Sequence, residues 1–491
     1  MTLPRFQNFI DGAFVDGSET FESLDPSTGE AWASMPAASA ADVDRAVAAA
    51  DRALHDPAWA GLTATARGKL LVRLGDLVAE HAGRLAELET RDTGKIIRET
   101  RAQIGYVAEY YRYFGGLADK LQGAYLPIDK PDMEVTLRRE PIGVVAAIVP
   151  WNSQLFLSAV KLGPALAAGC TVVLKASEDG PAPLLEFARL VEKAGFPKGV
   201  VSVLTGLGEP CGRALTAHSL VSRVAFTGGP GTARYVVRNT AENFAHTTLE
   251  LGGKSPVVVF ADADLDSASN AIVAGIFAAS GQSCVAGSRL YVERAVEARL
   301  VAMLKDKAER IAIGDPHDPT TEMGPLATAR QREGIEAVLA RSLEAGGTLV
   351  TGGGRPTSRD GGFWFEPTIV AARDNATPCM VEELFGPVLS VLPFEGEAEA
   401  LTLANDSRYG LASGVFTANL GRAHRMIRGI KAGIVWVNTY RAVSPIVPFG
   451  GYGRSGLGRE GGLESILDYT RTKAAWIRTS DDPIPDPFVM R

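Results

Sequence analysis

The strongest constraint on the fold lies between Pro141 and Phe260, where short apolar runs alternate with helix-prone stretches such as Pro181–Ala194. Strands that alternate with helices form a parallel sheet covered by helices on both faces, and such sheets bind dinucleotides at the carboxyl ends of their strands. The sequence therefore predicts a doubly wound α/β unit. The expected strands are Ile142–Val149, Cys170–Lys175, Val200–Leu204, Val221–Phe226 and Val257–Phe260.

The composition is typical of a soluble globular protein. The 491 residues are 46% hydrophobic and 22% charged, with a formal net charge of -7, so nothing suggests a nucleic-acid partner. The cysteines Cys170, Cys211, Cys284 and Cys379 form no CxxC pair, so we expect no metal site and no disulfide framework. No apolar run reaches membrane-spanning length, and Met1–Phe14 lacks a signal-peptide pattern. We therefore expect a cytoplasmic protein without a membrane partner.

Two further segments flank the predicted α/β unit at 141–260. Residues 122–139 contain two prolines and little helical periodicity, which predicts a two-stranded excursion, although an ordinary surface hairpin fits the same pattern. A second α/β block extends from Asp262 to Phe449, with strands expected near Ser288–Val292, Phe365–Val370 and Gly433–Val437. The length suffices for two or three domains.

Helical periodicity dominates the N-terminal part of the chain. The last helical run carries a stripe of aromatic residues, and such a stripe is more often packing than a ligand site. We interpret it mainly as packing. The helical runs are Ala41–Leu54, Ala64–Glu80, Arg84–Arg91 and Glu99–Leu117.

A cysteine lies between a helix-prone stretch and a predicted strand of the second block. Gly281-Gln282-Ser283-Cys284 follows Leu265–Ala279 and precedes Ser288–Val292. A cysteine at such a junction is held by rigid elements and can face a cleft, where its thiolate is the reactive form. Taken alone, a free cysteine is more often a small buried hydrophobe.

Three other motifs favour a catalytic cysteine: Pro150-Trp151-Asn152, Leu249-Glu250-Leu251-Gly252-Gly253-Lys254 and Glu382-Glu383-Leu384-Phe385-Gly386-Pro387. Together the four motifs resemble the aldehyde dehydrogenase superfamily, in its NAD(P)-dependent, hydrolytic type. The resemblance extends from about Asn8 to Lys473. It implies a Rossmann-type cofactor domain, an α/β catalytic domain and a small β oligomerisation arm.

The resemblance also implies how the chain divides. We expect an NAD-binding domain at 1–121 and 141–253, a catalytic domain at 254–455, and an oligomerisation arm with a C-terminal segment at 122–140 and 456–491. The arm is expected to pair with the C-terminal strand of a neighbouring subunit, which makes a homodimer or homotetramer the expected assembly.

The resemblance assigns catalytic roles to four residues. Cys284 would attack an aldehyde carbonyl, and its backbone N–H together with the Asn152 side chain would stabilise the oxyanion. Glu250 would activate the water that hydrolyses the resulting thioester, and Lys161 would support this network. Relatives that pass the acyl group to coenzyme A usually lack this glutamate, so a free acid is the expected product. Taken singly, Asn152 would equally fit a helix cap, and Glu250 and Lys161 solvated surface charges.

Cofactor contacts are implied in the same way. Lys175 would reach the adenosine ribose, Glu178 its hydroxyls, Glu383 the nicotinamide ribose and Phe385 the nicotinamide. A carboxylate at Glu178 favours NAD over NADP because it would repel a 2′-phosphate. Taken singly, Lys175 and Glu178 would be solvated charges beyond a strand. Further cofactor-binding candidates are Ile148, Trp151, Ser177, Gly208, Phe226, Thr227, Gly228, Gly229, Leu251 and Gly252.

One run departs from the family pattern. Gly229-Pro230-Gly231-Thr232-Ala233 stands where the family usually has Ser-Thr-x-x-Gly. The hydroxyls expected at 229 and 230 are missing, so the side-chain hydrogen bonds that they would donate to the pyrophosphate are not expected here. Pro230 suits the first turn of a helix, whose N-terminus can still meet a phosphate.

The substrate is expected to be a small aldehyde. Ser153 stands where many relatives have an aromatic ring, which implies a roomier or more polar pocket. Arg441 could bind a carboxylate on the substrate, or it could face solvent or a neighbouring subunit. The expected substrate-binding residues are Ser153, Leu157, Ser283, Val285, Arg441 and Phe449.

The main hypothesis is NAD-dependent oxidation of an aldehyde to a carboxylic acid. The first alternative is an NADP-preferring semialdehyde dehydrogenase with the same catalytic residues. A catalytically silent binding protein on the same fold is a second alternative, because fold does not fix function. A cysteine hydrolase with a histidine partner is a third, although none of the six histidines lies in a recognisable partner motif.

Overall fold

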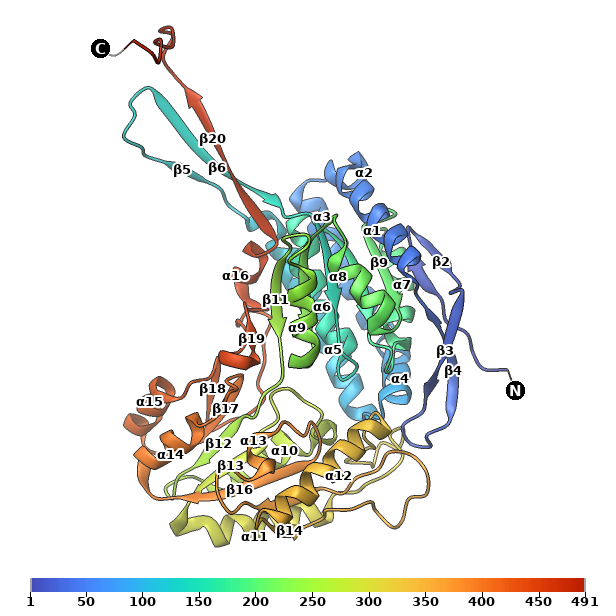
Figure 1. The fold of residues 1–491 in the computed structure, drawn as a ribbon, viewed down its shortest axis with the longest axis vertical. Coiled ribbons are helices and arrows are strands. Elements are labelled where there is room, and N and C mark those ends of the chain that lie inside the picture. Colours follow the sequence, from blue (N-terminus) through green and yellow to red (C-terminus); the bar gives the residue numbers. More distant parts are fainter. Residues whose placement is uncertain (1, 490–491) are drawn as a thin grey trace.

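The computed structural model describes residues 2–489, and Figure 1 shows two α/β units from which a β-stranded arm projects. Within the described residues, the sheet of the first unit has the strand order β19-β11-β10-β7-β8-β9-β1-β2. The strands from β11 to β9 run parallel, which confirms the predicted α/β fold. They are β7 (Val144–Ile148), β8 (Thr171–Ala176), β9 (Val201–Thr205), β10 (Val221–Thr227) and β11 (His246–Glu250), flanked by the antiparallel edge strands β1 (Asn8–Ile10), β2 (Ala13–Val15) and β19 (Gly456–Leu457). Of these, β11 and the short edge strand β19 were not predicted.

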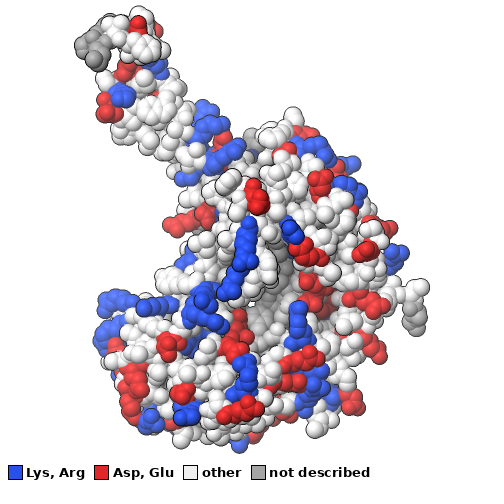
Figure 2. Space-filling view, viewed as in Figure 1, with Lys and Arg blue, Asp and Glu red and all other residues white. Residues whose placement is uncertain are grey.

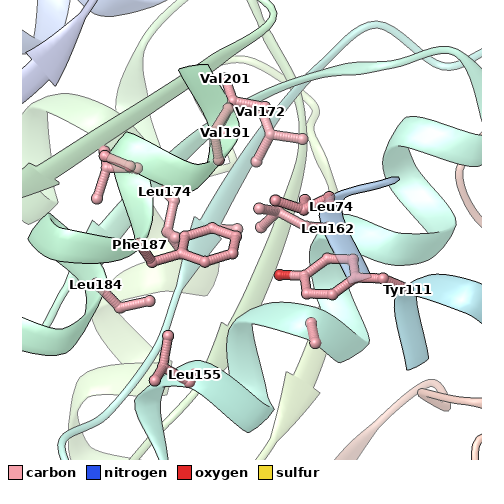
Figure 3. Packing of buried hydrophobic residues seen from close by; sticks show 14 of the residues in the cluster. Leu74, Tyr111, Leu155, Leu162, Val172, Leu174, Leu184, Phe187, Val191 and Val201 are labelled. Atoms are coloured by element: carbon pink, nitrogen blue, oxygen red, sulfur yellow. The ribbon is translucent and has the colours of Figure 1, made fainter. Parts of the chain in front are cut away.

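Helices cover both faces of this first sheet because its strands are apolar on both sides. Along β8, Val172 and Leu174 pack against the helices of one face, whereas Val173 packs against those of the other. Figure 3 shows the first of these faces, where Leu174 lies near Phe187. The helices of the first face are α3 (Ala64–Glu80), α4 (Ala82–Thr93), α5 (Ile97–Leu117), α6 (Gln154–Ala168) and α7 (Ala182–Ala194); those of the second are α1 (Ala40–His55), α8 (Arg213–Ala217) and α9 (Pro230–Asn239).

The second unit is built on another largely parallel sheet. Among the described residues its order is β14-β15-β16-β13-β12-β17-β18. The strand predicted at Val257–Phe260 exists as β12, but it belongs to this sheet and not to the first. An apolar run of this kind suits either sheet, so the sequence alone did not distinguish them. The strands are β12 (Pro256–Val259), β13 (Arg289–Glu293), β14 (Thr348–Thr351), β15 (Thr368–Ala371), β16 (Val388–Phe394), β17 (Ala412–Phe416) and β18 (Ile434–Val437).

Helices accompany the second sheet as well. They separate its strands along the chain, as in the first unit. The main ones are α10 (Leu265–Ile276), α11 (Arg294–Arg310), α12 (Ala329–Glu344), α14 (Gly396–Asn405) and α15 (Leu420–Gly429). No helix within residues 2–489 is long and apolar enough to cross a bilayer.

The arm contains the predicted two-stranded excursion and a third strand. β5 (Ala124–Leu126) pairs with β6 (Met133–Pro141), and β6 pairs along its whole length with β20 (Thr470–Arg478) of the same chain. The chain's own C-terminal strand therefore occupies one edge of β6, and pairing of the arm with a neighbouring chain stays a prediction. The chain's own strand is tethered nearby through α16 (Gly462–Leu467), which packs against α6, so pairing within the chain is favoured.

The division into domains follows these sheets. We propose the boundaries 1–121 with 141–253, 254–455, and 122–140 with 456–491. The short strand β19 pairs with β11, so the C-terminal segment returns to the first sheet before it enters the arm.

Candidate active site

A cavity of about 780 Å³ lies between the two units. Loops that follow β7, β10 and β11 line one side, and the cysteine loop, the turn at 383–385 and the segment 434–449 line the other. α5 closes a third side. Figure 2 shows the molecular face hollowed near its centre, with acidic and basic side chains interspersed around the hollow. The loops at the carboxyl ends of the parallel strands and the predicted nucleophile Cys284 therefore line the same cavity.

Cys284 lies on a loop that follows α10 and is partly exposed to this cavity. Before it, Ala279, Ser280 and Gly281 all have left-handed backbone conformations, with φ of 51°, 53° and 71°. A Cβ at position 281 would lie 2.2 Å from the backbone of Gly386, so only glycine fits there. Burial, followed by the nearby carboxylates of Glu383 and Glu250, raises the pKa of the Cys284 thiol to about 12. The side chain is therefore a thiol at neutral pH, and its activation requires a base.

Asn152 follows β7 and lines the same cavity. Its Nδ2 donates to the backbone oxygen of Gln282 at 3.0 Å, two residues before Cys284. This hydrogen bond joins the loop that carries the predicted oxyanion donor to the loop that carries the predicted nucleophile. The alternative interpretation of Asn152 as a helix cap does not hold, because the cap residue of α6 is Ser153 and no side-chain capping bond is formed there.

Glu250 ends β11, and only 3% of its surface is exposed. Neither carboxylate oxygen has a hydrogen-bond partner among the described residues. Burial, together with the charge of Glu460, raises the pKa of Glu250 well above its usual value, while Lys161 and Arg459 oppose this shift. A buried carboxyl group with a raised pKa that lines the cavity of Cys284 has the properties of a general base.

Lys161 is not a solvated surface lysine, because it is fully buried on α6. Its Nζ donates to Thr227 Oγ1 at 2.7 Å and forms an ion pair with Glu460, whose own side chain is buried. Lys161 does not line the cavity, whereas Glu460 does. Sequence reasoning missed Glu460, since it lies in a glycine-rich loop without periodicity or motif.

Most cofactor candidates lie at or after the carboxyl ends of neighbouring parallel strands of the first sheet, whereas Glu383 and Phe385 lie in the second unit. The candidates fall into two groups. The first group lines the cavity: Trp151, Thr227, Gly228, Gly229, Leu251, Gly252, Glu383 and Phe385. The second lies outside it: Ile148, Lys175, Ser177, Glu178, Gly208 and Phe226. In this second group the side chains of Ile148 and Phe226 pack in the core.

The adenosine-side candidates Lys175 and Glu178 are close together. Lys175 Nζ lies 3.5 Å from a carboxylate oxygen of Glu178, and Glu178 is partly exposed at the end of β8. Lys175 itself is buried and also donates to the backbone of Ala176 at 3.0 Å. Pro230 is the first residue of α9, as its sequence position predicted.

Glu383 lies on the side of the cavity formed by the second unit. Its Oε1 accepts the backbone N–H of Gly253 at 2.9 Å, and burial raises its pKa to about 7. A Cβ on Gly252 would lie 1.8 Å from the Glu383 carboxylate, so the glycine makes room for this side chain. Across the cavity, the rings of Trp151 and Phe385 meet edge to face with centroids 5.6 Å apart.

All six predicted substrate residues, Ser153, Leu157, Ser283, Val285, Arg441 and Phe449, line the cavity. Arg441 donates to the backbone oxygen of Ala274 at 2.8 Å, and no carboxylate of the described residues lies within ion-pair distance of it. The aromatic stripe of α5 divides: Tyr106 and Tyr110 face the cavity, whereas Tyr111 and Phe114 pack in the core. Sequence reasoning missed the cavity residues Lys95, Glu99 and Gln103, although their spacing of four was a signal.

Comparison with known proteins identifies the group to which this architecture belongs. Residues 14–475 match the model of the aldehyde dehydrogenase family. The chain belongs to the aldehyde dehydrogenase family. The predicted family, fold and enzyme class are thereby confirmed.

Individual aldehyde dehydrogenases match over their full length. A protein of Acinetobacter baylyi named (Z)-2-((N-methylformamido)methylene)-5-hydroxybutyrolactone dehydrogenase is 60% identical over 490 residues, which cover 100% of both chains. Betaine aldehyde dehydrogenase of Rhizobium etli is 40% identical, with 99% of both chains covered. The structure of betaine aldehyde dehydrogenase from Staphylococcus aureus in complex with NAD+ has a TM-score of 0.96 at 37% identity, and the match covers 99% of this chain and 97% of that one.

Proposed function

We propose that this aldehyde dehydrogenase oxidises an aldehyde to a carboxylic acid with NAD as the cofactor. The observation that carries the proposal is the presence of Cys284, Asn152 and Glu250 around one cavity. The NAD+ complex of the Staphylococcus aureus enzyme supports the choice of cofactor.

The catalytic steps follow from the positions of these side chains. Cys284 loses its proton to solvent, and the thiolate attacks the aldehyde carbon to form a thiohemiacetal. Asn152 Nδ2 and the backbone N–H of Cys284 stabilise the oxyanion. NAD, when bound, supplies the hydride acceptor that converts this adduct into a thioester. Glu250 then removes a proton from water, which attacks the thioester, breaks the carbon–sulfur bond and releases the acid.

The residues at the sheet edge fit a dinucleotide. Lys175 and Glu178 would hold the adenosine ribose, and Glu383, for which Gly252 leaves room, would hold the nicotinamide ribose. A carboxylate at Glu178 favours NAD, whereas Lys175 beside it would tolerate a 2′-phosphate and keeps the NADP-preferring alternative open. We expect a higher kcat/KM with NAD. An equal or higher value with NADP would favour the alternative.

Substitution of the nucleophile tests the activity. Cys284→Ala should abolish NADH formation from a panel of aldehydes, because the Cys284 thiol is the only group that forms a covalent bond to the substrate in this proposal. Binding of NAD, measured by calorimetry, should persist. Cys379→Ala removes another cysteine, buried in the core of the second unit, and serves as the matched control. Appreciable turnover by Cys284→Ala would refute the proposal, and the absence of activity from the parent with every aldehyde would favour a silent binding protein.

For the substrate, we propose a short aldehyde that carries a carboxylate. The 60% identical relative is named for a 5-hydroxybutyrolactone. Such a ring is the closed form of a chain with an aldehyde at one end and a carboxylate at the other. Two cations line the cavity: Lys95, which is paired with Glu89, and Arg441, which has no carboxylate partner among residues 2–489. An arginine fork can bind a carboxylate with two hydrogen bonds and so place the aldehyde before Cys284.

Matched substrates test this choice. A carboxylate-bearing semialdehyde should exceed an uncharged aldehyde of equal length by at least a few-fold in kcat/KM, and should also exceed the cationic betaine aldehyde, the substrate named for the 40% identical relative. Arg441→Ala should remove this gain selectively, whereas the exposed Arg428→Ala should not. Equal losses on charged and neutral substrates would mean that Arg441 is structural.

We further propose that the protein acts in the cytoplasm as a homo-oligomer. Its cysteines are all free, as expected of a reducing compartment. The arm projects from the body of the molecule and exposes the large apolar side chains of Tyr125, Trp476 and Ile477. Such an exposed apolar surface supports contact with another copy of the chain.

A further inference from the structure

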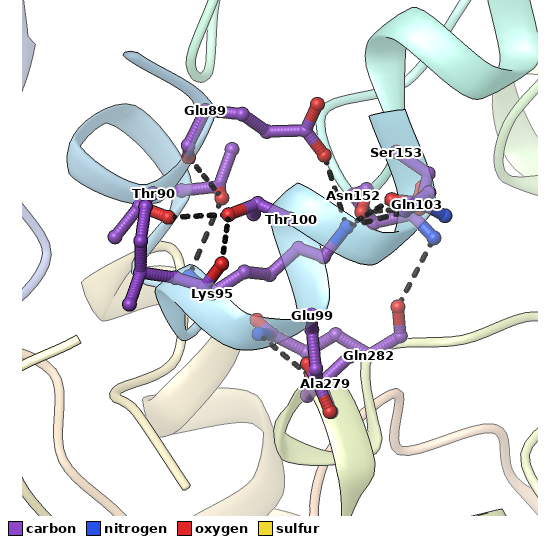
Figure 4. A network of polar contacts seen from close by, with 12 residues as sticks. Glu89, Thr90, Lys95, Glu99, Thr100, Gln103, Asn152, Ser153, Ala279 and Gln282 are labelled. Atoms are coloured by element: carbon purple, nitrogen blue, oxygen red, sulfur yellow. Dashed lines mark hydrogen bonds and ion pairs between the residues drawn. The ribbon is translucent and has the colours of Figure 1, made fainter. Parts of the chain in front are cut away.

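Three polar residues on one side of the cavity remain outside the catalytic scheme. Lys95 lies just before α5, and Glu99 and Gln103 lie on it. The spacing of four places Glu99 and Gln103 on one face of the helix, and all three residues line the cavity. Figure 4 shows them between the loop of Asn152 and the loop that leads to Cys284.

Glu99 holds the loop of the nucleophile. Both of its carboxylate oxygens accept the backbone N–H of Ala279, at 2.9 and 3.0 Å. The backbones of Ala279 and Ser280 adopt left-handed conformations that residues other than glycine rarely take. Such a conformation persists only where surrounding contacts hold it, and Glu99 supplies one of these contacts. The charge on the carboxylate makes it a stronger acceptor than a neutral group.

Lys95 and Gln103 hold the loop of the oxyanion donor. Lys95 Nζ and Gln103 Nε2 donate to Ser153 Oγ at 3.4 and 3.2 Å. The Ser153 hydroxyl in turn donates to the backbone oxygen of Asn152 at 2.6 Å. Lys95 is fixed by Glu89 at 2.9 Å and by Gln103 Oε1 at 2.5 Å. An aromatic ring at position 153 could not relay these hydrogen bonds, so the serine connects Asn152 to α5.

The two loops also touch each other, because Asn152 Nδ2 donates to Gln282 O. Given the proposed roles of Cys284 and Asn152, we propose that Lys95, Glu99 and Gln103 are positioning residues. They fix the oxyanion donor relative to the nucleophile. Positioning of this kind accelerates attack on the aldehyde, since small errors in geometry cost large factors in rate. Hydrolysis of the thioester depends on Glu250 and water and is less sensitive to them.

Variants of Glu99 test the nucleophile side. Glu99→Ala should slow the pre-steady-state burst of NADH, which reports thioester formation, by about tenfold. Glu99→Gln should restore it to within about twofold, because the amide oxygen still accepts the Ala279 N–H. The rate of Cys284 alkylation by iodoacetamide should likewise fall in Glu99→Ala and recover in Glu99→Gln. Glu109→Ala, an exposed glutamate of the same helix that does not line the cavity, should match the parent.

Variants of Ser153 test the donor side independently. Ser153→Ala should slow the burst, and Ser153→Thr, which keeps the hydroxyl, should restore it. Melting temperatures and NAD binding should stay near those of the parent, so a general loss of folding is separated from a loss of positioning. If Glu99→Ala fails to fold, the Ser153 pair decides the question.

The inference is overturned if Glu99→Ala and Ser153→Ala keep the parental burst, or if Glu99→Gln and Ser153→Thr are as slow as the alanine variants. Failure of the proposed function is distinct from both outcomes. It would appear as turnover by Cys284→Ala, or as a parent enzyme that gives no burst at all.

Discussion

At the scale of single residues, Glu250 combines a buried position with a role that requires a charge. Glu250→Gln should leave the first half of the reaction able to proceed and block hydrolysis, because an amide cannot accept the proton of water. We expect a burst of NADH followed by stalled turnover, with the acyl-enzyme visible by intact mass. Unchanged steady-state turnover across the pH range would contradict the base role.

The same side chain should limit stability at high pH. Because burial raises the pKa of Glu250 in the folded protein, the folded state keeps this proton to a higher pH than the unfolded chain does. The group therefore favours folding below its usual pKa of 4.5, and this contribution is lost as the pH rises through the raised value. Glu250→Gln should melt at a higher temperature than the parent at pH 8, and the difference should shrink toward pH 4.5. Glu192→Gln, on the exposed side of α7, should show no such trend.

At the scale of elements, the turn between α10 and the cysteine depends on a glycine. Gly281 has a φ of 71°, and a Cβ there would lie 2.2 Å from the backbone of Gly386, which cannot yield as a side chain could. Gly281→Ala should therefore lower the free energy of unfolding by about 2 kcal/mol or more and abolish activity. Chemical denaturation with the activity assay checks both effects.

A glycine inside a helix provides the opposite case. Gly334 lies on the exposed side of α12, and a Cβ there meets nothing within 4 Å. Gly334→Ala should raise the free energy of unfolding by about 0.4–1 kcal/mol and leave activity unchanged. A similar small effect at Gly281 would mean that the cysteine loop tolerates another backbone conformation.

At the scale of the whole molecule, the arm exposes large apolar side chains that a single chain does not cover. Tyr125, Trp476 and Ile477 are 62%, 57% and 54% exposed there. Figure 2 shows that much of the arm carries neither sign of charge. Such a surface favours contact with another copy of the chain. Light scattering after size exclusion should therefore give a mass of two or four subunits, and Trp476→Glu should shift it to smaller species. Leu349→Glu, on the edge strand β14, should leave the mass unchanged, and a monomeric parent would rule out this role for the arm.

The sequence by itself determined most of the architecture. Most strands of the first sheet and most of its helices could be predicted because hydrophobic periodicity is local and strong in segments such as α3. The motifs around Cys284, Asn152 and Glu250 were recognised because together they resemble one enzyme family, whereas each residue taken singly also fits a structural role. The sequence did not assign Val257–Phe260 to the second sheet. It also did not predict β11, a run of five residues in which only Leu249 is strongly hydrophobic.

Only the tertiary structure decided which distant groups meet. It brought Glu460 to Lys161 and Glu99 to Ala279, across 299 and 180 positions of the chain. It also paired β20 with β6 of the same chain. Such contacts depend on the packing of two sheets and not on local periodicity, so no spacing in the sequence encodes them. The raised pKa values of Glu250 and Cys284 have the same origin, because burial is a property of the folded molecule.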